Sequence, residues 1–124
     1  MMKAAAEINT TYQNKIADFT KATESFIKGG YFDDADIAVK SAVVFANESQ
    51  KREIAEKVKE AYKTQAKLLL DSDRRSRALK VYERISEMNL NEKEKQEVND
   101  KLLFLYEKLG KVRDYQLLKK NKTN

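Results

Sequence analysis

The feature that most constrains this fold is a phrase that occurs three times: an apolar helical stretch, a short polar turn, and a second helix. The clearest copy passes through Gly29-Gly30, the second through Asp71-Ser72-Asp73, and the third through Gly110. A chain that repeats such a unit buries its apolar faces by stacking one helical hairpin on the next. The phrase therefore predicts an all-α fold built from helix pairs.

Six helical segments follow from apolar residues spaced three and four apart. They cover about residues 3–28, 33–47, 50–70, the stretch from the Asp71-Ser72-Asp73 turn to Met88, 91–109 and 112–120. We predict Asp33 as the N-cap of the second segment, Asn47 or Ser49 as that of the third, and Asn91 with Glu94 as a capping box for the fifth. The inner stripe of the first segment includes Ile8 and Tyr12.

These turns resemble those of the tetratricopeptide repeat, in which a glycine and an aromatic residue form the turn and alanines seven residues apart begin the second helix. The residues that carry the resemblance are Gly30, Tyr31, Phe32, Ala35 and Ala42 in the first pair, Ala78 and Ile85 in the second, and Leu102, Tyr106 and Gly110 in the third. The resemblance implies three antiparallel helix pairs stacked as a short right-handed solenoid.

The copies are spaced unevenly along the chain. Ala35, Ala78 and Tyr115 occupy equivalent positions, separated by 43 and 37 residues, against about 34 in the family. The chain also has no proline and no tryptophan. A closed helical bundle would give nearly the same pattern and is the alternative fold. We expect one all-α domain over residues 1–118 and a basic polar tail over 119–124.

The composition argues against catalysis. The 124 residues include neither histidine nor cysteine, the side chains most often used for proton transfer and nucleophilic attack near neutral pH. Asp33, Asp34 and Asp36 form the densest acidic cluster, and we interpret them as acids that stabilise a helix N-terminus. We therefore expect no enzyme activity and no catalytic, cofactor-binding or metal-binding residues.

The apolar segments are short. The longest uninterrupted one is Ala42–Ala46, five residues, against about twenty needed to span a bilayer. The first residues soon turn polar and lack the apolar stretch of a signal peptide. With no cysteine to form disulfides, the sequence predicts a soluble cytoplasmic protein without a membrane span.

Positive charge is concentrated after residue 49. The net charge is +5 overall, but −2 over residues 1–49 and +7 over residues 50–124. One cluster follows the second turn and contains Arg74, Arg75, Arg77, Lys80 and Arg84. The other, near the C-terminus, contains Lys108, Lys111, Arg113, Lys119, Lys120 and Lys122. Clusters of cations bind acidic protein segments, phosphate backbones and anionic headgroups alike.

Three hypotheses follow from these observations. The first is a scaffold or interaction module that binds an acidic peptide or partner helix on a concave or basic face. We predict its partner-binding residues to be Arg74, Arg75, Arg77, Lys80, Tyr82 and Arg84, with Tyr82 and Tyr106 as candidates for aromatic contact. The second is a nucleic-acid-binding accessory protein that uses both basic clusters. The third is a homo-oligomer, such as a dimer, that buries Leu68, Leu103 and Leu117.

Overall fold

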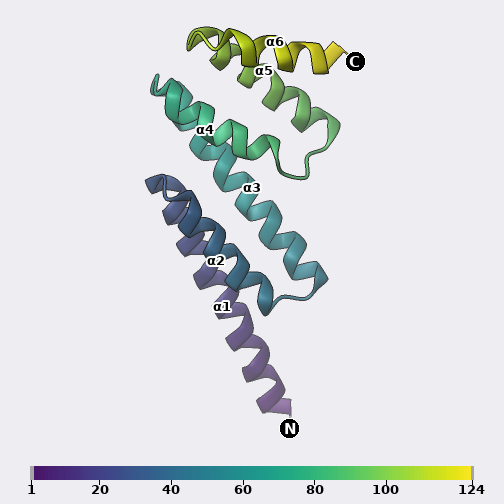
Figure 1. The fold of residues 1–124 in the computed structure, drawn as a ribbon. Helices are drawn as coiled ribbons and strands as arrows, with labels where there is room; N and C mark the ends of the chain where they lie inside the picture. Colours follow the sequence, from purple (N-terminus) through teal and green to yellow (C-terminus); the bar gives the residue numbers. More distant parts are fainter. Residues whose placement is uncertain (1, 124) are drawn as a thin grey trace. The chain divides into compact units, whose positions relative to one another are not determined.

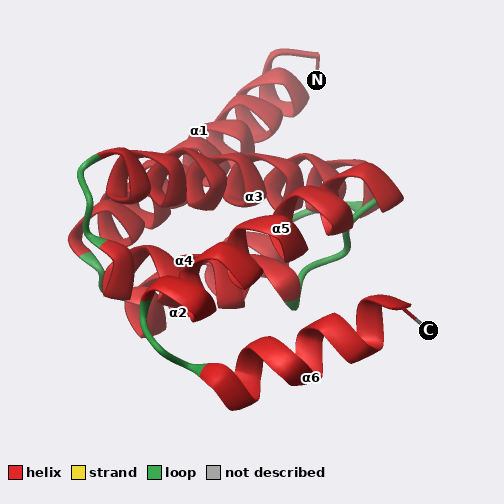
Figure 2. Ribbon diagram, turned by 90° about the horizontal axis from the view of Figure 1, so that it is seen from above, coloured by secondary structure: helices red, strands yellow, loops and turns green. Residues whose placement is uncertain are grey.

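The structure is a computed structural model that describes the backbone of residues 2–123 and the side-chain environments of residues 15–121. Within this part of the chain, all regular secondary structure is helical. The helices are α1 (Met2–Gly29), α2 (Phe32–Val44), α3 (Glu48–Asp71), α4 (Arg75–Ser86), α5 (Glu92–Lys108) and α6 (Val112–Thr123) (Figure 1). Short loops join them, and residues 2–123 contain no strand (Figure 2). The all-α prediction is confirmed.

The chain divides into two compact units, Met1–Ala61 and Tyr62–Asn124, where the sequence suggested one domain over residues 1–118. The boundary lies inside α3. Helix α6 continues to Thr123, so residues 119–123, predicted as a polar tail, are helical. The side chains of Ile8 and Tyr12, predicted on the inner stripe of the first helix, lie outside the described residues.

The recurring phrase corresponds to one backbone geometry. Each turn contains a residue in the left-handed region: Gly30 with φ 81°, Asp73 with φ 60° and Gly110 with φ 71°. In every case the next residue donates its N–H to the carbonyl oxygen five positions earlier, at 2.8 Å in all three turns. This bond is the signature of the Schellman motif, which ends a helix by satisfying its last carbonyl groups. All three copies are thus structural equivalents.

Two of the helices begin with a reciprocal cap. Asn47 accepts a hydrogen bond at 2.8 Å from the Gln50 N–H, and the Gln50 side chain accepts one at 2.9 Å from the Asn47 N–H. Asn91 and Glu94 make the same pair of bonds at the start of α5. The predicted caps at Asn47 and Asn91 are therefore confirmed.

The helices that follow the first two turns begin differently. The N-cap residues of α2 and α4 are Tyr31 and Arg74, and neither side chain makes a capping hydrogen bond. The prediction of Asp33 as an N-cap was wrong: α2 begins at Phe32 and Asp33 lies in its first turn. In both cases the residue that follows the left-handed residue of the turn is the N-cap of the next helix.

Small residues form the core of the first unit. Helix α2 packs on α1 through Ala35, Ala38 and Ala42, all buried, with Ile27 of α1 also buried. Alanine lets two helices approach closely, because its side chain adds little bulk. At the other end of this antiparallel pair, the Lys15 Nζ atom lies 5.0 Å from the Phe45 ring centre.

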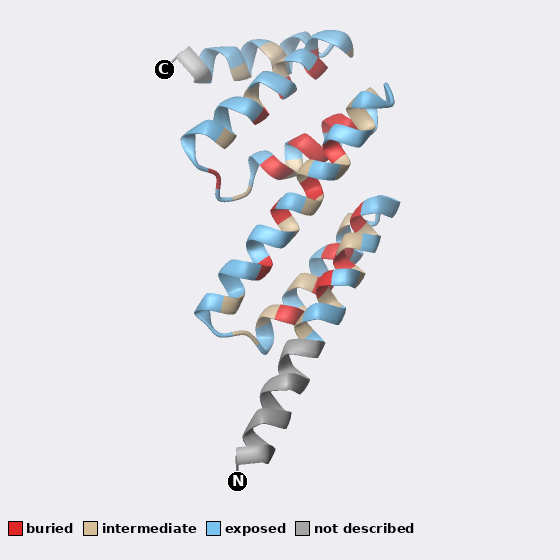
Figure 3. Ribbon diagram, turned by 180° about the vertical axis from the view of Figure 1, so that it is seen from behind, coloured by how far each residue is buried: buried red, intermediate tan, exposed pale blue. Residues whose placement is uncertain are grey.

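Larger aliphatic residues form the core of the second unit, where α4 packs on α5 and α5 on α6. The buried residues of α4 and α5 include Val81, Ile85, Leu102 and Leu105 and lie along one side of each helix (Figure 3). An ion pair between Lys63 of α3 and Glu94 of α5 joins these two helices. The second unit thereby positions the end of α3, the second turn and α5 together.

Candidate functional site

The second turn determines where the predicted arginines lie. Asp73 takes the left-handed conformation, Arg74 is the N-cap residue, and α4 begins at Arg75. The first turn of α4 contains no acidic residue, whereas that of α2 contains Asp33 and Asp34. The positive end of the helix dipole disfavours cations at an N-terminus. The arginines therefore occupy positions that helix stability alone would not select.

Helix periodicity separates the six predicted residues. Arg77, Lys80 and Arg84 are spaced three and four apart and therefore share one side of α4. We call them the cationic stripe. Arg77 and Lys80 are exposed and Arg84 is half-buried. Within the described part of the chain, Arg77 and Lys80 form no ion pair.

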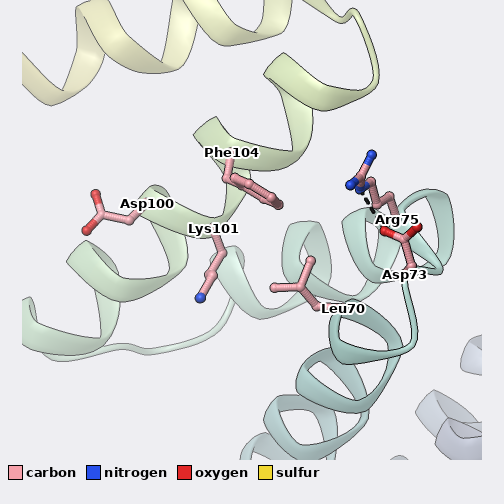
Figure 4. A pocket seen from close by; sticks show the side chains of 6 residues that line it. All are labelled: Leu70, Asp73, Arg75, Asp100, Lys101 and Phe104. Carbon is pink, nitrogen blue, oxygen red and sulfur yellow. Dashed lines mark ion pairs between the residues drawn. The ribbon is translucent and has the colours of Figure 1, made fainter.

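Arg75 points away from the stripe and pairs with the turn. Its Nε atom lies 3.0 Å from the Oδ1 atom of Asp73 (Figure 4). The contact joins the first residue of α4 to the left-handed residue of the turn, so it holds the guanidinium close to the end of α3. A guanidinium carries five N–H donors, and this ion pair engages the one on Nε.

Arg75 is also at the edge of a hollow of about 380 Å³, which we call the Leu70–Phe104 cleft. Its lining residues are Leu70, Asp73, Arg75, Asp100, Lys101 and Phe104. The side chains of Leu70 and Phe104 extend into the space between the end of α3 and α5, while the Asp100 carboxylate points away from it (Figure 4). The cleft therefore has an apolar centre, with the cations Arg75 and Lys101 and the carboxylates of Asp73 and Asp100 around it.

A second, more open hollow adjoins the cleft. It has a volume of about 520 Å³ and is lined by Asp73, Arg74, Arg75, Ser76 and Arg77. Asp73 and Arg75 line both hollows, so the apolar cleft and the arginine-rich start of α4 form one continuous surface. Arg77 belongs both to this surface and to the cationic stripe.

The two tyrosines predicted as contact residues are buried. Tyr82 is 8% exposed and Tyr106 is 9% exposed, so both pack in the core, as the apolar stripes of the sequence favour, and neither is an exposed aromatic side chain. Tyr82 follows Ala78 by four residues and faces the core with it. Burial, and secondarily the Asp71 carboxylate, raises the pKa of Tyr82. Tyr82 therefore supports the site from within.

Tyr106 links α5 to α4. Its hydroxyl donates a hydrogen bond at 3.1 Å to the Glu83 carboxylate. Burial raises the pKa of Tyr106 to about 12, and the negative charges of Glu83 and Asp114 and the hydrogen bond to Glu83 add to this effect. A hydroxyl held in its protonated form serves as a structural donor at neutral pH.

Five of the six residues that line the cleft were not among the predicted site residues: Leu70, Asp73, Asp100, Lys101 and Phe104. Phe104 is a large apolar residue of α5 and is 40% exposed. Lys101 and Lys108 flank it at the helical spacing of three and four residues, and the Lys108 Nζ atom lies 5.7 Å from the Phe104 ring centre. An exposed aromatic residue between two lysines was the available signal.

The leucines predicted to be buried in a homo-oligomer line neither hollow. Leu68 and Leu117 are exposed and Leu103 is half-buried.

Within the described residues, no three acidic side chains gather closely enough to hold a metal ion. Across the same residues no helix combines the length and the apolar character needed to cross a membrane.

The comparisons leave the family open. No family model, curated protein or solved structure matches this chain. The resemblance to the tetratricopeptide repeat thus rests on the three equivalent turns and on the residues that carry it.

Proposed function

We propose that this protein is an interaction module that binds an acidic segment of a partner protein along the cationic stripe and the arginine-rich start of α4. The observation that carries the proposal is the placement of Arg74, Arg75 and Arg77 at a helix N-terminus. Residues that break a local stability rule are expected at functional sites; here the ion pair with Asp73 offsets part of the cost at Arg75.

The charge of the second unit supports the same conclusion. Residues 62–124 contain 16 basic and 10 acidic residues, a net charge of +6, whereas residues 1–61 have a net charge of −1. A concentrated positive field raises the association rate of acidic partners and disfavours basic ones. Arginine is suited to this role because its planar fork binds a carboxylate through two parallel hydrogen bonds.

A protein segment fits this surface better than a nucleic acid does. A phosphate backbone needs clustered cations only, but the arginines here adjoin a cleft centred on Leu70 and Phe104. An apolar side chain of a peptide would fill such a cleft. Nucleic-acid binding through the two basic clusters is the alternative, and it predicts binding that does not depend on the cleft.

The proposed module is a short right-handed array of helix pairs in a cytoplasmic protein. The three turns with the same hydrogen bonds support the array, and the absence of cysteine supports a reducing compartment. In this arrangement the three turns join equivalent pairs of helices, and the residues that follow the second turn bind the partner.

The test measures binding of a labelled peptide in which one leucine stands between glutamates, by fluorescence anisotropy at low and high salt. The variant Arg77→Glu/Lys80→Glu should lower the affinity about tenfold, because two favourable charge contacts become repulsive. The matched control is Lys93→Glu/Lys111→Glu, which changes the net charge equally at exposed positions outside the two hollows.

Equal loss in both variants would reduce the effect to net charge and overturn the proposed site, and so would the absence of peptide binding. A short DNA duplex and a short single strand are titrated in parallel. If either binds more tightly than the peptide and Phe104→Ala leaves that binding unchanged, the nucleic-acid alternative replaces the proposal.

A further inference from the structure

We infer that the Leu70–Phe104 cleft is the specificity pocket for the partner, and that it accepts one leucine- or phenylalanine-sized side chain flanked by acidic residues. This inference rests on the proposed function and adds the residue pattern that the partner must carry. The occupant is therefore an acidic segment with an apolar anchor, not a uniformly charged one.

The lining of the cleft suits a large apolar side chain. Its volume of about 380 Å³ is within the range of ligand pockets, about 300–1,000 Å³, so it has room for one such side chain and for part of the peptide beside it. Leu70 and Phe104 provide apolar surface from two different helices, and Phe104 is 40% exposed. Covering this surface removes apolar area from water and so favours binding.

The charges around the cleft specify the flanking residues. Within the described part of the chain, Lys101 forms no ion pair or hydrogen bond, so its ammonium group is available to a carboxylate. Arg75 engages Asp73 through Nε and retains donors on its other nitrogens. Lys101 lies on α5 and Arg75 on α4, at opposite edges of the apolar centre (Figure 4). A peptide residue seated between Leu70 and Phe104 would thus have a cation on each side.

The experiment compares two labelled peptides that differ at one position: a leucine between glutamates, and an alanine between the same glutamates. Each is titrated against wild-type protein, Phe104→Ala, Leu70→Ala and Arg77→Glu/Lys80→Glu. Leu68→Ala is the matched control, since Leu68 lies on the same helix as Leu70, is exposed and does not line the cleft.

We expect Phe104→Ala and Leu70→Ala to weaken binding of the leucine peptide about tenfold and to leave the alanine peptide nearly unchanged. Leu68→Ala should change neither. Circular dichroism of each variant establishes that the helices are retained.

If Phe104→Ala and Leu70→Ala have no effect while Arg77→Glu/Lys80→Glu weakens both peptides, the pocket is wrong and the proposed function stands. If Arg77→Glu/Lys80→Glu also has no effect, the proposed function fails as well. Sedimentation of the free protein tests the remaining occupant: self-association that Phe104→Ala abolishes would assign the cleft to a second copy of the chain and overturn the inference.

Discussion

The first and second turns have the same backbone and different chemistry. Gly30 and Asp73 both adopt the left-handed conformation, and each is followed by a helix whose N-cap side chain makes no capping bond. The helix after Gly30 begins with two aspartates, as the helix dipole favours, whereas the helix after Asp73 begins with arginines. Equivalent turns are thus followed by helix starts of opposite charge in the two units.

The residue three positions before each left-handed residue shows the same contrast. In the first unit it is Ile27, which is 1% exposed. In the second it is Leu70, half-buried at the cleft. Equivalent positions in equivalent turns therefore differ in burial, and the proposed binding surface lies where the repeat leaves an apolar residue partly uncovered.

The largest predicted effect separates these two residues. Ile27→Ala should reduce the free energy of unfolding by about 2–5 kcal/mol, because it opens a cavity in a filled core. Leu70→Ala should cost less than about 1 kcal/mol, because the side chain already borders a hollow. Urea unfolding followed by circular dichroism measures both. Equal losses would mean that Leu70 is as much a core residue as Ile27.

Exchanging the turn residues tests whether the two turns are equivalent. Gly30→Ala should destabilise the protein by about 1 kcal/mol, since no atom lies within 4 Å of the added Cβ and the cost is the positive φ alone. Asp73→Gly should stabilise it by up to about 1 kcal/mol for the same reason, less the exposed ion pair with Arg75. Thermal unfolding gives both values. A destabilising Asp73→Gly would show that Asp73 is needed for its side chain.

Exchanging the charges at the two helix starts should have smaller effects, of opposite sign. Arg77→Glu should stabilise α4 and Asp34→Lys should destabilise α2, each by about 0.3–1 kcal/mol at low ionic strength. High salt should reduce both effects by screening. Chemical denaturation at two salt concentrations measures them. Arg77→Glu should at the same time weaken peptide binding. If the free energy of unfolding of this variant is unchanged, Arg77 does not destabilise α4, and the proposal loses the argument drawn from its placement.

The last prediction concerns the second unit and is tested at alkaline pH. The pKa of Tyr106 is raised from 10.0 to about 12, so the folded state retains its proton where the unfolded state loses it. The stabilising contribution is complete below pH 10 and is lost as the pH rises from 10 to about 12. A titration of ¹³C-labelled tyrosines by NMR should show Tyr106 ionising near pH 12, above the ordinary tyrosine value of 10.0. Ionisation of Tyr106 near pH 10 would contradict the buried contact with Glu83.

The helix boundaries could be predicted because their signals are local. A cap such as Asn91 with Glu94 acts across three residues, and the turn around Gly30 is closed by hydrogen bonds within six. The sequence also indicated that Asp73 stands in a glycine position. Asp33 was misassigned as a cap because the turn itself starts α2, one residue before it.

The candidate site was only partly predictable. The spacing of Arg77, Lys80 and Arg84 predicts that they share one side of α4 and form the cationic stripe. The same periodicity places Tyr82, four residues after Ala78, on the buried side. Leu70 and Phe104, by contrast, are 34 residues apart and no local rule brings them together. They meet because the tertiary packing brings the end of α3 beside α5, two helices that an ion pair between Lys63 and Glu94 also joins.

By itself, the amino-acid sequence determined the uneven distribution of charge. It also determined the helices and the three equivalent turns, because caps, left-handed residues and helical periodicity act within one or two turns of the chain. Only the tertiary structure decided which apolar residues remained uncovered beside the arginines. That outcome depends on how distant helices pack. Packing leaves the second copy of the recurring turn beside an apolar cleft, and the turn and the cleft together form a candidate binding surface.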